Sequence, residues 1–262
     1  MLFLKALLLG IVEGATEFLP VSSTGHLIIA SDLLNYPEAQ RATFEIFIQL
    51  GAILAVYWHY RRELLGLVQR ARSESRARDL IAKVLLAFVP AAAVGVLIHH
   101  WIEDNLFSVR VVAAALIVGG AIIWLVELMP RRASVTDIEA TTWRQSIWVG
   151  IAQISSLFPG VSRAAATIIG GMLTGMDRPV ATQFSFYLAL PTLTAASLFS
   201  LAKAWKTMTP DEASSLTIGF VTAFITALLV IRGFLRYVQT HDFRPFAYYR
   251  IFIGILILVY LS

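Results

Sequence analysis

Long apolar stretches alternate with short polar segments along the whole chain. Several of them approach the ~20 residues that an α-helix needs to cross the hydrocarbon core of a bilayer. Pro and Gly occur inside them, as is common in membrane helices. The pattern predicts an all-α polytopic membrane protein with spans at residues 44–60, 80–98, 111–128, 180–201, 216–231 and 251–261.

Residues 1–35 break this pattern. A short apolar run is followed by "EGATEFLPVSSTGH", which holds two glutamates, a proline and several hydroxyl groups. A carboxylate at the bilayer centre costs at least ~2.5–3.5 kcal/mol, and Pro20 interrupts any continuous helix. We therefore expect a re-entrant hairpin whose first half-helix ends near Phe18, whose turn covers residues 19–21, and whose second half-helix leaves through residues 28–34. A polar cavity should surround the broken backbone.

An internal repeat appears when the sequence is shifted by about 140 positions. "GIVEGATEFLPVSSTGHLII" at residues 10–29 then lies against "GIAQISSLFPGVSRAAATII" at residues 150–169, and both contain a proline turn followed by Val-Ser. The same register places Phe44 over Phe184 and Arg110 over Arg250.

Each copy would be one re-entrant helical hairpin plus three transmembrane helices, and an odd number of crossings inverts the second copy. We predict one integral membrane domain, residues 1–262, with inverted repeats at approximately 1–130 and 140–262. Inverted repeats with broken helices place a polar site near the midplane, so the two hairpin tips should meet there.

Charge and cysteine content narrow the classes of function. Only 15% of the residues are charged, against about 25% in soluble domains. The net charge of +4 reports membrane orientation rather than a nucleic-acid partner. The basic loops at 61–83, 131–144 and 232–244 are expected in the cytoplasm, with 101–110, 203–215 and both termini outside. The absence of cysteine excludes disulfides and thiolate chemistry.

Two pairs of polar residues are candidates for lining the cavity. Glu13 and Glu17 are four residues apart and share one helix face. They suit a hard divalent cation or a general acid–base pair, or they form a buried hydrogen-bonded pair that holds helices together. Glu45 and Gln49 repeat this spacing on the third apolar segment and could line the same cavity.

The residues Ser22, Ser23, Thr24 and Gly25 follow the first proline turn and should begin a helix. Free N–H groups and hydroxyls at a helix N-terminus can bind phosphate; ordinary helix capping by serine is the alternative. His26 lies within reach of both serine hydroxyls. It could act as a base for a serine nucleophile or as the nucleophile itself, or it could be structural.

Arg163 stands at the tip of the second hairpin. Its guanidinium is always charged and can bind phosphate oxygens in a bidentate manner; alternatively it neutralises Glu13 or Glu17 directly. Ser162 and Thr167 could add hydroxyl contacts to phosphate, or they could cap and back-bond their own helix. Together these residue types indicate phosphoryl chemistry on a lipid-linked phosphate. A transporter or flippase of a polyprenyl phosphate lipid is the rival interpretation, because inverted repeats are common in transporters.

The quoted segments resemble the undecaprenyl pyrophosphate phosphatase family, also called bacitracin-resistance proteins. "EGATEFLPVSSTGH" resembles the first signature of that family, "FEIFIQLGAILAV" the following helix, and "PGVSRAAAT" the second signature. The family usually reads Ser-Arg-Ser-Gly where Ala164 and Ala165 follow Arg163 here. One hydroxyl and one flexible glycine are therefore replaced, while the arginine is kept.

The resemblance implies hydrolysis of undecaprenyl diphosphate to the monophosphate in a bacterial inner membrane, with a divalent cation, Mg or Ca, and a site open to the outer face. It also implies that bacitracin competes indirectly, by sequestering the substrate, and it is compatible with a homodimer. The nucleophile is left open among Ser23, His26 and water. The implied catalytic residues are Glu17, Ser23, His26 and Arg163; the phosphate-binding residues are Ser22, Thr24, Gly25, Ser162, Thr167 and Arg163; the metal ligands are Glu13 and Glu17.

Overall fold

The computed structural model describes residues 2–106, 108–130, 133–204 and 213–260. Apart from an isolated bridge between Val135 and Met176, the regular structure of these residues is helical. The first half contains α1 (Leu2–Thr16), α2 (Ser23–Leu33), α3 (Glu38–Arg70), α4 (Ser75–Leu106) and α5 (Val109–Leu128). The second half contains α6 (Trp143–Ile154), α7 (Arg163–Leu173), α8 (Arg178–Ala204), α9 (Ala213–Tyr237) and α10 (Arg244–Tyr260).

Five helices, α3, α4, α5, α8 and α9, are long and apolar enough to cross a membrane. This confirms the prediction of an all-α polytopic membrane protein. Several helices continue beyond the apolar stretches: α3 reaches Arg70, past the predicted end at residue 60. Helix α10 has 17 described residues, and its role as a sixth span stays a prediction.

Both predicted interruptions are helical hairpins. The turn between α1 and α2 covers residues 17–22 and includes the expected turn at 19–21. The second hairpin consists of α6 and α7, joined through a short 3-10 turn at Ser155–Leu157. At 1.5 Å per residue, the 15 residues of α1 span only ~22 Å, less than the ~30 Å of a hydrocarbon core. Neither arm of the first hairpin can therefore cross a bilayer alone.

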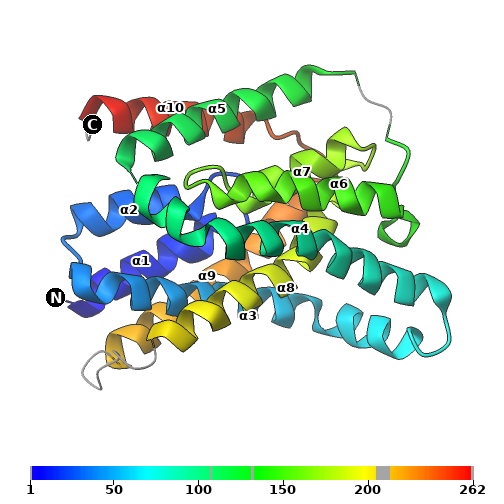
Figure 1. Cartoon of the computed structure of the whole chain (residues 1–262), viewed down its shortest axis with the longest axis horizontal. Coiled ribbons are helices and arrows are strands. Elements are labelled where there is room, and N and C mark those ends of the chain that lie inside the picture. Colours follow the sequence, from blue (N-terminus) through cyan, green and yellow to red (C-terminus); the bar gives the residue numbers. More distant parts are fainter. Residues whose placement is uncertain (1, 107, 131–132, 205–212, 261–262) are drawn as a thin grey trace.

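The two hairpins point in opposite directions along the long axis of the molecule. Helix α1 runs inward from the end that holds both termini and α2 returns to it, whereas α6 and α7 do the same from the other end (Figure 1). This is the arrangement that an inverted repeat would produce, and the symmetry relation remains a prediction. Residues 131–132 and 205–212, which entered the orientation prediction, lie outside the described residues.

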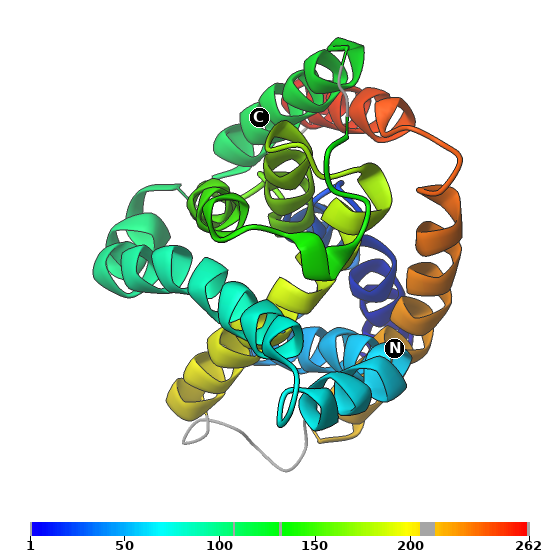
Figure 2. The same ribbon diagram turned by 90° about the vertical axis from the view of Figure 1, so that its right-hand side faces the viewer.

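Helix α1 packs against α9 and α3, while its opposite face, with Leu4, Leu7 and Ile11, is exposed. Figure 2 shows α1 in blue beside α9 in orange. Two glycines allow its close approach to α9. A Cβ on Gly10 would stand 2.6 Å from the Gly219 carbonyl oxygen, and one on Gly14 would stand 2.5 Å from the Ala223 carbonyl oxygen. The first hairpin is therefore packed against protein backbone.

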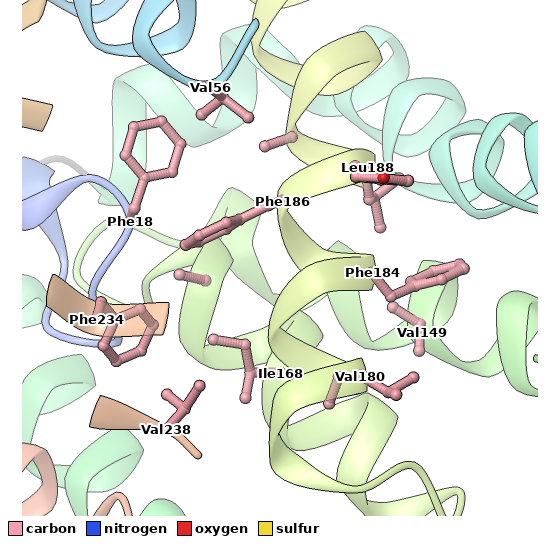
Figure 3. Packing of buried hydrophobic residues seen from close by; sticks show 14 of the residues in the cluster. Phe18, Val56, Val149, Ile168, Val180, Phe184, Phe186, Leu188, Phe234 and Val238 are labelled. Carbon is pink, nitrogen blue, oxygen red and sulfur yellow. The ribbon is translucent and has the colours of Figure 1, made fainter. Parts of the chain in front are cut away.

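Aromatic packing anchors the tip of the first hairpin in the core. Phe18 is fully buried and meets the ring of Phe186 on α8 edge to face, with 5.5 Å between ring centroids. Figure 3 shows Phe18 beside Phe186, with Val56 of α3 and Phe234 of α9 nearby. Because four elements converge here, the apolar core fixes the position of the turn.

Polar contacts hold the start of α10 against α5 and α8. The Glu127 carboxylate of α5 accepts hydrogen bonds from the Phe243 N–H at 3.0 Å and from Arg178 at 2.5 Å. Asp242 accepts from the side chain and the backbone N–H of Arg244, and the side-chain hydrogen bond holds the pKa of Asp242 below its usual value. These contacts place α10 beside α5.

Candidate active site

The tips of the two hairpins touch. The Ser162 hydroxyl lies 3.5 Å from the Leu19 carbonyl oxygen, and the Arg163 guanidinium lies 3.2 Å from a Glu17 carboxylate oxygen. These contacts join residues more than 140 positions apart in the sequence. The structure thus brings the acidic part of the first hairpin and the basic part of the second into one cluster.

The two turns have the same local geometry. Ser22 and Ser162 both adopt φ +74°, a left-handed conformation that is rare outside glycine. Each serine caps the following helix, with its hydroxyl accepting from the N–H of Gly25 at 3.4 Å or of Ala165 at 3.2 Å. Helix capping is therefore the observed role of both serines. The other N–H groups at these helix starts have no intrahelical partner and carry the positive end of the dipole.

Glu17 contacts both a serine hydroxyl and the Arg163 guanidinium. Its Oε2 accepts a hydrogen bond from the Ser23 hydroxyl at 2.5 Å, and its Oε1 pairs with Arg163. The side chains of this ion pair are only 8% (Arg163) and 5% (Glu17) exposed. Because water screens this buried pair only weakly, its two charges interact more strongly than those of a surface ion pair.

Arg163 is held from α8 as well. One of its terminal nitrogens donates to both the carbonyl and the hydroxyl oxygen of Ser185, each at 3.2 Å. Thr167 back-bonds to the Arg163 carbonyl oxygen at 2.9 Å, and its hydroxyl lies 2.6 Å from that of Ser185. Arg163 Nε is buried and has no partner among the described residues, so one donor remains for another acceptor.

Ser185 was missed by sequence reasoning, although a signal existed. Under the shift of 140 positions it corresponds to Glu45, which was expected to line the cavity. Glu45 itself pairs with Arg41 at 3.0 Å, and Gln49 accepts from Ser197 of α8 at 3.0 Å. Hydrogen bonds therefore tie these two side chains to other partners than the Glu17 cluster.

His26 bonds to different groups than expected. One ring nitrogen, Nδ1, lies 2.7 Å from the Ser22 carbonyl oxygen, and Nε2 lies 2.7 Å from the Tyr249 hydroxyl. Because a carbonyl only accepts, Nδ1 donates to Ser22; in the neutral form of the ring, Nε2 then accepts from the Tyr249 hydroxyl. The rings also stack, with 5.5 Å between centroids. The Ser23 hydroxyl, by contrast, donates to Glu17.

Glu13 is the candidate ligand for a cation. It is buried, and its Oε2 has no partner among the described residues, which suits a hard divalent ion. Both oxygens of Glu17 are already engaged. No group of three His, Asp or Glu side chains able to hold a metal occurs in the described ranges. The residues fit a cation bound through Glu13 that takes its other ligands from water and substrate.

A separate cavity lies away from this cluster. It has a volume of about 940 Å³ and lies at the base of the second hairpin, lined by residues of α6, α7 and the segment before α6, among them Arg144, Gln145, Trp148 and Thr174. None of the predicted site residues lines it.

The sequence of the chain matches known proteins over almost its full length. Residues 6–256 match the family model described as "Bacitracin resistance protein BacA". Three relatives are named undecaprenyl-diphosphatase: that of Methylobacillus flagellatus is 47% identical and covers 99% of this chain and 98% of its own, that of Nitrosospira multiformis is 49% identical (98% and 94%), and that of Thermoanaerobacter pseudethanolicus is 45% identical (98% and 96%). The chain belongs to the bacitracin resistance protein BacA family.

Proposed function

We propose that the protein is a membrane phosphatase that hydrolyses undecaprenyl diphosphate to undecaprenyl phosphate and inorganic phosphate. The observation that carries this proposal is the chain of contacts from Ser23 through Glu17 to Arg163 at the meeting point of the hairpins. It combines a hydroxyl nucleophile, a carboxylate base and a phosphate-binding cation. Family membership and the names of the relatives support the same substrate.

The diphosphate head group would bind where α2 and α7 begin. Ser23 and Arg163 are the first residues of these helices, so two helix N-termini converge on the same place, each favourable for anions. The prenyl tail would lie between apolar helices. Thr24 and Gly25 lie in the first turn of α2, and Thr167 lies on α7. All three are therefore on the helices whose first turns would bind the phosphate.

The chemistry would start at Ser23. Its Oγ attacks the terminal phosphorus while Glu17 Oε2 takes the hydroxyl proton; the bond from that phosphorus to the bridging oxygen breaks, and undecaprenyl phosphate leaves. Water then attacks the phosphoserine phosphorus and the P–Oγ bond breaks. Glu17 returns its proton to Ser23 Oγ, and both hydrogens of the water leave with inorganic phosphate as dihydrogen phosphate. Phosphate oxygens would draw Arg163 away from Glu17, leaving the carboxylate free to accept the proton.

His26 would hold the backbone of the turn in place, and it would be the second group near the site, after Glu17, that can exchange a proton. Its bond to the Ser22 carbonyl oxygen fixes the backbone next to Ser23, and its Nε2 is shared with Tyr249. This favours Ser23 over His26 as the nucleophile, since Ser23 alone of the two touches the carboxylate. Trapping and mapping a phosphoenzyme would decide between them.

A divalent cation, Mg or Ca, would bind beside Glu13 together with the substrate phosphates. When bound, it would neutralise phosphate charge. We expect phosphate release to be lost after treatment with EDTA and restored by adding Mg²⁺ or Ca²⁺. Full activity in a chelated, metal-depleted sample would contradict the assignment of Glu13.

We further propose a bacterial inner-membrane location with the site open to the periplasmic side. The basic loop at 61–83 and the termini lie at opposite ends of the long axis (Figure 1), which supports a topology with this loop in the cytoplasm and the termini outside. Recycling of the carrier lipid there would explain bacitracin resistance: bacitracin would compete by sequestering the substrate. A homodimer is compatible with this function and is not required by it.

The test is release of phosphate from undecaprenyl diphosphate in detergent micelles. The wild type should release it, and Ser23→Ala should lose about 1000-fold or more in rate, as expected for a nucleophile. Ser155→Ala removes an exposed hydroxyl from the second hairpin and should behave as wild type. Micelles have no sides to cross, so the assay measures hydrolysis alone. A protein that only transports lipid breaks no phosphoanhydride bond and would release no phosphate; that outcome would favour the transporter.

A further inference from the structure

Arg250 of α10 is a fully buried arginine outside the cluster described above. Its side chain makes four hydrogen bonds, and all four acceptors are backbone carbonyl oxygens. No carboxylate pairs with Arg250 in the described part of the chain. A buried charge that is compensated only by carbonyl dipoles is costly, so the contacts that it makes call for an explanation.

Two of these carbonyls belong to the two hairpin tips. Nη1 donates to the Pro20 carbonyl oxygen at 3.1 Å, and Nη2 donates to the Gly160 carbonyl oxygen at 3.0 Å. Pro20 and Gly160 are 140 positions apart, so they are equivalent in the repeat register. Each stands three residues before the first residue of the following helix, Ser23 or Arg163. One guanidinium therefore binds the same point of both turns.

The other two acceptors and a glycine attach the guanidinium to α5. The Ala115 and Leu116 carbonyl oxygens accept at 3.1 and 3.4 Å. Gly119 provides the space: a Cβ there would stand 2.2 Å from Nη2 and 2.9 Å from Cζ of Arg250. Since the guanidinium is planar and rigid, the distance between its nitrogens sets the distance between the two turns.

We infer that Arg250 is a positioning residue that holds the two hairpin tips in register, so that Ser23 with Glu17 faces Arg163 across the reacting phosphate. This rests on the proposed phosphatase function. Arg250 does not touch the reacting groups; it acts through the carbonyls of Pro20 and Gly160. A lysine cannot replace it, because one ammonium on a flexible stem cannot hold both carbonyls at a fixed spacing.

The experiment compares Arg250→Lys with Gly119→Ala. The second variant keeps the arginine but fills the space beside Nη2, so it displaces the guanidinium without removing charge. Both should lower kcat by about 100-fold, the effect of a misplacement of ~1 Å, while KM stays close to that of the wild type. The controls are Arg110→Lys, the exposed repeat partner of Arg250, and Gly233→Ala, whose Cβ would meet nothing within 4 Å. Both controls should match the wild type.

Kinetic constants are normalised to folded protein, measured by size-exclusion chromatography and thermal unfolding in detergent. A raised KM with unchanged kcat would show that Arg250 binds substrate, and unchanged kcat and KM would show that the clamp is dispensable; either result overturns the inference. If neither variant folds, Arg250 is a residue of the fold alone, which also overturns it. Absence of phosphate release by the wild type would instead reject the proposed function.

Discussion

The two hairpins share a backbone and differ in chemistry. Both turns place a capping serine at φ +74° immediately before a short helix. At the next position the first hairpin has Ser23 and the second has Arg163. Ten positions before these residues stand Glu13 and Gln153, both buried and each with one side-chain atom lacking a partner in the described structure.

The two hairpins therefore contribute different side chains to the cluster. The first hairpin carries the carboxylates, the hydroxyl and the histidine, whereas the second carries the arginine, with Leu157 and Ala166 at the positions that match Glu17 and His26. Opposite charges on equivalent turns attract when the turns meet, so the asymmetry of the side chains helps to join the two tips. Two hairpins with the same turn geometry can thus bring complementary side chains together.

The largest effect should follow from removing the ion pair that joins the hairpins. Arg163→Ala or Glu17→Ala should each lower phosphate release by ~1000-fold or more, the range known for an arginine that stabilises phosphoryl transfer. Arg70→Ala is the control, because Arg70 also forms ion pairs with glutamates, Glu74 and Glu139, but on the surface. Near-normal turnover by purified Arg163→Ala would reject the assignment of the site.

A smaller effect is expected at the hydrogen bond between Tyr249 and His26, which has no counterpart in the second hairpin. Tyr249→Phe removes a bond of ~1 kcal/mol and should reduce kcat about fivefold. Tyr248→Phe is the matched control, since the Tyr248 hydroxyl accepts from Trp124 instead. If both variants keep the wild-type rate, the orientation of His26 does not depend on Tyr249.

The smallest effects should come from the two capping serines, and they should be alike. Ser22→Ala and Ser162→Ala each lose a cap worth about 1 kcal/mol of stability. The glycine variants should be less destabilised than the alanine variants by ~1 kcal/mol, because glycine accepts positive φ. Unfolding by denaturant in detergent measures both differences. Equal stability of the alanine and glycine variants at either position would contradict the shared turn geometry.

The sequence by itself determined most of the elements and identified the polar residues that meet at the hairpin tips. Apolar length predicts the five observed spans, and Pro20 with the intramembrane carboxylates predicts the first hairpin, because both features are incompatible with a continuous helix in lipid. The shift of 140 positions predicts the second hairpin and points to Arg163. The predictions of the spans and of the first hairpin depend on local sequence and on the physics of the bilayer, whereas the second hairpin follows from comparing distant segments of the sequence.

Only the tertiary structure decided which groups bond to one another. Glu17 accepts hydrogen bonds from Ser23 and Arg163. His26 bonds to the Ser22 carbonyl oxygen and to Tyr249. Arg250 donates to the carbonyl oxygens of the two turns. A helical register says which residues share a face, but hydrogen bonds act over about 3 Å. Partners from α8 and α10 are selected by packing between distant segments, which no local pattern in the sequence encodes.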